Sequence, residues 1–249
     1  MATSKYFTVK VEPTILAGRQ NSAAYASGDL VFDWAAFDVP KGTNRLIDAT
    51  VIMYGTAGVR QDAQLDYYFA KSRNNVAPVS LGTSNGSAVG VGYYNDLLGT
   101  FTIHDSDYSH GLDYLAVASG PRTGNAHSVN PTLCLTGEPN SGANVGYDRL
   151  YVAGIAVGAP DFRNTINVDS TAGVLGTDQA LLIVQGTDAR RCFDVGDVVN
   201  DQDDRLMGTI KSVDSATQLT MESNLANASV DEKKLFPASP IKLILSFER

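Results

Sequence analysis

Three short segments of this chain contain residues that could do chemistry, and a serine motif is the first of them. Gly82–Gly86 reads GTSNG and matches the G-x-S-x-G pattern, in which Ser84 would be a nucleophile. That pattern requires a strand before the serine and a helix after it, because the strained turn between them exposes the hydroxyl. The following residues, Ser87–Asn95, are interrupted by glycines and have no helical pattern. We therefore expect an ordinary β-turn around Ser84.

The second segment, His104–His110, brings two histidines close in sequence to Asp105 and Asp107. Imidazole and carboxylate groups at this spacing can hold a metal ion or relay a proton. A zinc site also needs ligands from rigid elements elsewhere, and His127 is the only other histidine in the sequence. We predict a polar surface turn between strands here, without a metal ion.

The third segment is an acidic loop whose carboxylates are the hard oxygen ligands that calcium prefers. It contains four aspartates: Asp197, Asp201, Asp203 and Asp204. An EF-hand loop that begins at Asp201 needs glycine at its sixth position and glutamate at its twelfth. Leu206 and Ser212 occupy those positions. We expect a solvated hairpin loop, and a calcium site of another type is the alternative. The sequence assigns no catalytic, cofactor-binding or metal-binding residue, so we expect neither an enzyme nor a cofactor.

The composition is that of a globular, acidic protein. Of 249 residues, 43% are hydrophobic and 18% are charged, and 23 glycines suit tight turns between short strands. The formal net charge of -8 repels phosphate groups, so we expect no direct contact with nucleic acid or with a membrane. Leu150–Pro160 is the longest apolar run, and it is too short to cross a bilayer. The first residues carry no apolar signal segment, which predicts synthesis in the cytoplasm. Cys134 and Cys192 are predicted to be free and buried.

The first part of the chain reads as a series of short strands. Lys5–Val11 alternates between apolar and polar residues, and about eight such runs follow one another up to residue 157. This spacing predicts a jelly-roll-like β-sandwich over residues 1–160, and an immunoglobulin-type sandwich fits almost as well. We expect Arg45–Gly55 and Gln64–Lys71 to be neighbouring antiparallel strands. The long polar stretch 72–97 should be a loop that contacts another surface.

Gly158–Pro160 marks the predicted boundary with a second unit, residues 161–249. Five short β-runs follow this boundary, which indicates a small SH3-like β-barrel. One short helix is expected at 229–236, because Ser229 and Glu232 form a capping-box pattern. The last run, Ile241–Phe247, alternates and could complete the small module or pair with Lys5–Val11. We assign it to the small module.

Phe193–Met221 resembles a small β-module that is common in structural proteins of tailed bacteriophages. The shared steps are F-x-V-G-D-V-V from Phe193, G-T-I-K-S-V from Gly208 and Q-L-T-M from Gln218. The first part is similar to phage virion proteins in being acidic, cysteine-poor and glycine-rich. The resemblance implies a virion structural protein, a decoration (cement) protein that binds the major capsid protein and stabilises the capsid surface, often as a homotrimer.

Two alternatives remain at this point. One is a tail or baseplate protein with a host-receptor or carbohydrate-binding role, with Tyr93–Tyr94 or the 72–97 loop as its contact surface. The other is an enzyme that degrades polysaccharide, which would require paired carboxylates in a cleft.

Overall fold

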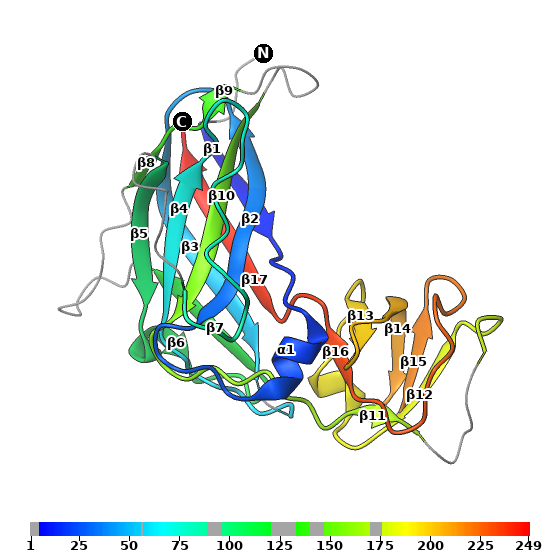
Figure 1. The fold of residues 1–249 in the computed structure, drawn as a ribbon. Coiled ribbons are helices and arrows are strands. Elements are labelled where there is room, and N and C mark those ends of the chain that lie inside the picture. The colour runs from blue at the N-terminus through cyan, green and yellow to red at the C-terminus, as the bar shows by residue number, and fades with distance from the viewer. Residues whose placement is uncertain (1–4, 56, 89–95, 121–132, 140–146, 170–175) are drawn as a thin grey trace.

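The computed structural model describes residues 5–55, 57–88, 96–120, 133–139, 147–169 and 176–249. Two antiparallel sheets form a sandwich, and a nearly closed barrel of six strands lies beside its lower end in Figure 1. The predicted all-β class, with a sandwich followed by a small barrel, is confirmed. In the described ranges no helix is long and apolar enough to cross a membrane.

Within the described residues, eleven strands form the two sheets of the sandwich. The first sheet has the order β1-β17-β3-β7-β6 with β8 paired to β3: β1 (Tyr6–Val11), β3 (Asn44–Tyr54), β6 (Tyr108–Ser109), β7 (Leu115–Gly120), β8 (Leu133–Leu135) and β17 (Ile241–Glu248). The second has the order β2-β10-β4-β5 with β9 paired to β10: β2 (Leu30–Pro40), β4 (Leu65–Lys71), β5 (Leu97–Ile103), β9 (Glu138–Pro139) and β10 (Tyr147–Ala156).

The connectivity of the longer strands is that of a jelly roll. The chain passes from one sheet to the other between β1 and β2, between β2 and β3, and again between β3 and β4. β17 pairs with both β1 and β3, while β10 pairs with both β2 and β4. The prediction that Arg45–Gly55 and Gln64–Lys71 are neighbours is therefore wrong. Both strands bury alternate residues, and alternation does not reveal which sheet a strand joins.

The last strand belongs to the sandwich, and its assignment to the small module is wrong. β17 lies between β1 and β3, with Phe247 opposite Phe7 and Leu245 opposite Ala49. The rings of Phe7 and Phe247 are stacked with centroids 5.2 Å apart. Every second residue of β17 is buried in the sandwich core. The barrel is thus an insertion between β10 and β17, and it does not extend to residue 249.

The barrel has its own hydrophobic core. Its members all lie between Ile166 and Leu235 in the sequence. A bridge between Asn167 and Lys234 brings the first and last strands close together. The strands follow the order β11-β12-β15-β14-β13-β16: β11 (Asn167–Val168), β12 (Leu181–Gln185), β13 (Val198–Asp201), β14 (Leu206–Ser215), β15 (Gln218–Met221) and β16 (Leu235–Pro237).

The α-helix is not where the sequence predicts it. Residues 229–233 contain a single turn at 231–232, Lys234 forms a β-bridge with Asn167, and β16 follows and pairs with β13. Glu232 has a φ of 57°, a left-handed conformation that interrupts a right-handed helix. In the part of the chain that the structure describes, the α-helix is α1 (Ala17–Ser22), and two 3₁₀ turns occur at Asp105–Asp107 and Ala189–Arg191. α1 has only six residues, so we attribute its formation to tertiary contacts rather than to helix propensity.

The described part of the predicted long loop, residues 72–88, covers the outer face of the second sheet. Leu81 packs with Leu30 and Ala153 in a small apolar cluster. The indole N–H of Trp34 donates to the Val79 carbonyl at 2.9 Å. The surface that this loop contacts is therefore the outer face of the second sheet of the same chain. Tyr93 and Tyr94 lie outside the described residues.

Candidate functional site at the junction of sandwich and barrel

Ser84 holds the 72–88 loop against β2. It lies in a turn, as predicted, and its hydroxyl donates to the Val31 carbonyl at 2.8 Å. The Tyr25 hydroxyl is also 2.8 Å from Ser84 Oγ. Burial raises the pKa of Tyr25 to about 12, so this phenol stays protonated at neutral pH and is a poor general base. The contacts of Ser84 are structural.

The histidine segment is divided between two sets of contacts. Asp107 is buried and accepts the backbone N–H of His104 at 3.0 Å, which caps the short turn. His110 lies on the surface, with Nδ1 2.7 Å from the Arg60 guanidinium and 3.6 Å from an Asp62 oxygen. Asp105 lines the same open hollow as Asp62 and His110.

A cationic guanidinium thus lies where a metal ion would have to bind. No group of three or more His, Cys, Asp or Glu side chains in the described ranges is placed to hold a metal. His127, the third histidine, lies outside those ranges.

The acidic residues lie in and next to the hairpin of β13 and β14, so the predicted hairpin is present, but two of the four aspartates are buried and not solvated. Asp197 is 8% exposed and Asp201 is 1% exposed. Asp201 forms an ion pair with Arg205 and accepts the backbone N–H groups of residues 203 and 205. Asp203 pairs with Lys233 at 2.8 Å. Asp204 accepts the N–H of Gly18, in α1, at 3.1 Å. The four carboxylates have different partners, which does not suit one shared cation.

Asp197 connects the barrel to the sandwich. Its Oδ2 accepts the hydroxyl of Tyr54, at the end of β3, at 3.1 Å and the N–H of Asp194 at 2.8 Å. Its Oδ1 is 3.5 Å from Nζ of Lys242, in β17, which also lies 3.6 Å from Glu12. Burial raises the pKa of the Asp197 carboxyl, and burial beside this carboxylate raises the pKa of Tyr54. Among the described residues, this ion pair joins the two units directly.

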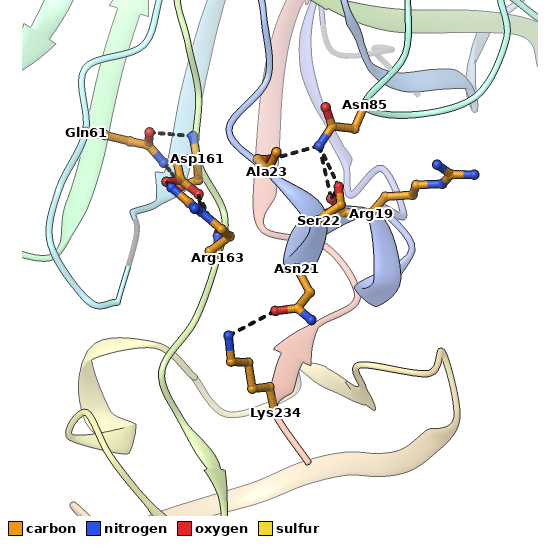
Figure 2. Close-up of polar contacts among 9 residues, drawn as sticks. All are labelled: Arg19, Asn21, Ser22, Ala23, Gln61, Asn85, Asp161, Arg163 and Lys234. Carbon is orange, nitrogen blue, oxygen red and sulfur yellow. Dashed lines mark hydrogen bonds and ion pairs between the residues drawn. The ribbon is translucent and has the colours of Figure 1, made fainter. Parts of the chain in front are cut away.

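Helix α1 makes a second connection. Gln20 is fully buried, and its amide nitrogen donates to the carbonyls of Ile15 and Pro237 at 2.8 Å each. Figure 2 shows Asn21 of the same helix reaching Lys234 of the barrel, at 3.1 Å. Figure 2 also shows Asn85 bonded to the end of α1, including the Ala23 carbonyl at 2.8 Å. The helix therefore joins the barrel to the loop that covers the second sheet.

The strand-to-barrel connection is held in the same way. The Gln61 side chain accepts the N–H of Asp161 at 2.7 Å, and its amide donates to the Asp161 carbonyl. The Asp161 carboxylate accepts the Arg163 guanidinium, with 2.6 Å between Oδ2 and Nη2. Both ends of the insertion are thus fixed by side-chain bonds.

We predict that Gln20→Met lowers the free energy of unfolding by about 1–3 kcal/mol, because two buried carbonyls lose their donor. Urea denaturation followed by circular dichroism measures the change. Arg19→Met is the matched control, since Arg19 is exposed on the same helix, and it should change the free energy by less than about 0.5 kcal/mol. Equal effects of the two variants would contradict the role of Gln20.

The two cysteines are free, as predicted, but only one is buried. Cys192 lies at the junction with its sulfur 3.6 Å from the Asn164 side-chain oxygen, and burial raises its pKa to about 12. Cys134 is exposed, which corrects the prediction. In β8 the flanking leucines are turned toward the core, so alternation places Cys134 on the outer face.

Two open hollows meet at Glu12 and Thr14 on the connection between β1 and α1. The smaller, of about 280 Å³, continues along the barrel past Asp197 and Val198. The larger, of about 420 Å³, lies between residues 10–14 and the segment of β2 that contains Trp34. Such a mixed polar and apolar groove can bind an extended chain or a sugar. No sequence motif predicts this groove or the junction of sandwich and barrel, because the residues that form them come from segments far apart in the sequence.

No protein-family model, curated protein or solved structure matches this chain. The resemblance to phage virion proteins therefore rests on the short sequence steps of Phe193–Met221.

Proposed function

We propose that this chain is a structural protein of a tailed-bacteriophage virion. In this proposal it is a decoration protein on the capsid surface, which binds the major capsid protein as a homo-oligomer and stabilises the lattice without catalysis. One observation carries the proposal: the stretch that resembles phage virion modules, Phe193–Met221, folds into β13, β14 and β15, three adjacent strands of one barrel. These three strands are contiguous in the sequence and contribute to the core of a single barrel, as a shared module should.

The way the barrel is attached supports a scaffold role. Asp197, Gln20 and Asp161 are engaged in bonds that fix the barrel against the sandwich. A protein that stabilises a lattice must transmit force between its contacts, so a fixed angle between its two units is useful. Ser84 and Asp107, whose side chains could in principle take part in catalysis, are likewise hydrogen-bonded to the backbone.

An apolar patch beside the junction is the proposed capsid contact. Val59 is 62% exposed and Leu112 is 50% exposed. They lie on adjoining loops, since the N–H of Arg60 donates to the carbonyl of the residue after Leu112 at 3.0 Å. Tyr114 is partly exposed beneath the guanidinium of Arg191, 4.5 Å from its ring centroid. Tyrosine, arginine and exposed apolar side chains together are typical of protein interfaces.

We predict that the purified protein co-sediments with capsids of its own phage that lack it, and that it raises their melting temperature. Leu112→Glu should weaken binding at least tenfold, which corresponds to about 1.4 kcal/mol, because it places a charge in the patch. Val76→Glu is the control, since Val76 is also exposed but lies on the 72–88 loop. Failure of the wild-type protein to bind capsids, or equal loss in both variants, would refute the proposal.

A tail or baseplate protein that binds carbohydrate is the second candidate. It is favoured by Trp34, which lines the larger hollow together with Glu12 and Asp33. An aromatic ring beside carboxylates in an open groove is a suitable platform for a sugar. Glycan-array binding that disappears in Trp34→Ala, with no binding to capsids, would select this candidate.

A further inference from the structure

We infer that β1 is a docking edge for a second copy of this chain, so that two copies pair their β1 strands across a two-fold axis. The two first sheets would then form one continuous sheet. This inference goes beyond the proposed function and does not depend on it, because it requires no capsid.

β1 is a regular strand at the end of its sheet. It pairs with β17 over six residues without a register shift, and it is the first strand in the sheet order. The N–H of Arg249 donates to the Lys5 carbonyl at 2.9 Å. Because hydrogen-bonded pairs alternate along an antiparallel ladder, Phe7 and Val9 direct their backbone groups toward β17. Thr8 and Lys10 therefore direct theirs away from it.

The other end strands of the two sandwich sheets are partly covered, irregular or short in the described part of the chain. On β2, Leu30 exchanges backbone hydrogen bonds with Asn85 and Gly86 of the covering loop. β5 is interrupted by a register shift in its pairing with β4, beside Gly99 with a φ of 159°. β6 has only two residues. Natural proteins protect edges that must not pair with bulges, prolines or lysines. β1 has neither a bulge nor a proline, and its one lysine, Lys10, would face Tyr6 in a register centred on Thr8.

The side chains of β1 are complementary to themselves in the antiparallel register centred on Thr8. In this register Tyr6 faces Lys10 of the second copy, and Phe7 faces Val9. The Lys10 ammonium, which pairs with Glu12 at 2.7 Å within its own chain, would then lie beside the ring of Tyr6 and the Glu248 carboxylate of the other copy. There it would share Glu248 with Lys5, whose ammonium is 2.5 Å from that carboxylate and 5.4 Å from the centroid of the Tyr6 ring. Phe7 and Val9 are half-buried at the sheet edge, and each would cover the other.

This self-complementarity of the β1 side chains favours a second copy of the chain as the partner. No like charges lie directly opposite one another in the Thr8-centred register, whereas a register centred on Lys10 would place the two lysines together. The Thr8-centred register also brings every outward-directed residue of the strand into the new ladder. The resulting symmetry is two-fold, in place of the three-fold symmetry that the phage resemblance implies.

The first test is Thr8→Pro. Proline removes the Thr8 N–H, which points away from β17, so the bonds within the chain remain while the bond to the second copy is lost. Sedimentation equilibrium should show a dimer for the wild-type protein and at least tenfold weaker association for the variant. Thr8→Val, the matched control, should dimerise like the wild type. A wild-type protein that is monomeric or trimeric at about 100 μM, or a dimeric Thr8→Pro variant, would overturn the inference.

A second pair of variants covers the case in which Thr8→Pro does not fold. Tyr6→Lys places a lysine opposite Lys10 and should weaken the dimer. Adding Lys10→Tyr to that variant restores a tyrosine opposite a lysine across the axis, and it should restore dimerisation. If the double variant associates no better than Tyr6→Lys, the proposed register is wrong.

Discussion

Removal of residues 241–249 should unfold the sandwich, although these residues are the last of the chain. They contain β17, which pairs with β1 on one side and β3 on the other. Without it, β1 loses its whole ladder, and four inward-facing side chains leave the core: Ile241, Leu243, Leu245 and Phe247. Burial of each such side chain is worth about 1.5–3 kcal/mol, so their combined loss approaches the entire stability of a typical domain.

The fluorescence of Trp34, the single tryptophan, reports on the sandwich directly because it lies in β2. The truncated protein should show no cooperative unfolding transition by this probe. The barrel has its core between Ile166 and Leu235, so circular dichroism should still detect a separate barrel transition. A sandwich transition that survives the truncation would contradict the position of β17.

A single substitution gives a graded version of the same test. Phe247→Ala should cost about 3–5 kcal/mol, because it removes a fully buried ring that stacks on Phe7 and leaves a cavity. Ser246→Ala, one residue earlier on the outer face, should cost less than about 0.5 kcal/mol. Both are measured by urea denaturation.

Asp197→Ala should destabilise the protein by about 3–5 kcal/mol. The variant leaves the buried Tyr54 hydroxyl and the Lys242 ammonium without their common acceptor, and removing one partner of a buried ion pair is costly. Asp197→Asn should cost clearly less, because the amide oxygen still accepts a hydrogen bond. If alanine and asparagine were equally well tolerated, the junction would not depend on this side chain.

The contribution of Asp197 to the free energy of unfolding also depends on pH. Burial raises the pKa of Asp197, so the folded protein binds this proton more tightly than the unfolded chain does. The contribution of Asp197 to stability therefore falls as the pH rises from the ordinary aspartate pKa, about 3.9, through the raised folded pKa. Above the folded pKa the contribution is constant.

The stability contributions of Glu248 and Asp188 change with pH in the opposite direction, because hydrogen bonds and ion pairs lower the pKa of these two carboxyls. The contribution of Asp197 is isolated by subtracting the free energy of unfolding of Asp197→Asn from that of the wild type at each pH. This difference should decrease with rising pH and then level off. A difference that increases with pH would contradict the raised pKa.

The sequence by itself determined the class of the fold and several local features. Alternation in Lys5–Val11 and Ile241–Phe247 predicts half-buried strands, because successive side chains of a strand point to opposite faces. Glycines around Ser84 predict a turn, because the conformational freedom that they provide is local. These features depend on residues that are close together in the sequence, so they can be predicted from the sequence alone.

Only the tertiary structure decided which strands pair, where the helix forms and what the aspartates hold. The alternating pattern of β17 is compatible with either unit. Its position in the sandwich is set by pairing with β1 on one side and β3 on the other. Helix α1 is too short to form by propensity, and Gln20 binds it to residues more than 200 positions away. The sequence predicts Asp197 in a solvated loop, and only the approach of Tyr54 and Lys242 reveals that its carboxylate is buried. Pairing, burial and charge neutralisation are long-range properties, and they are decided by residues that the local sequence does not contain.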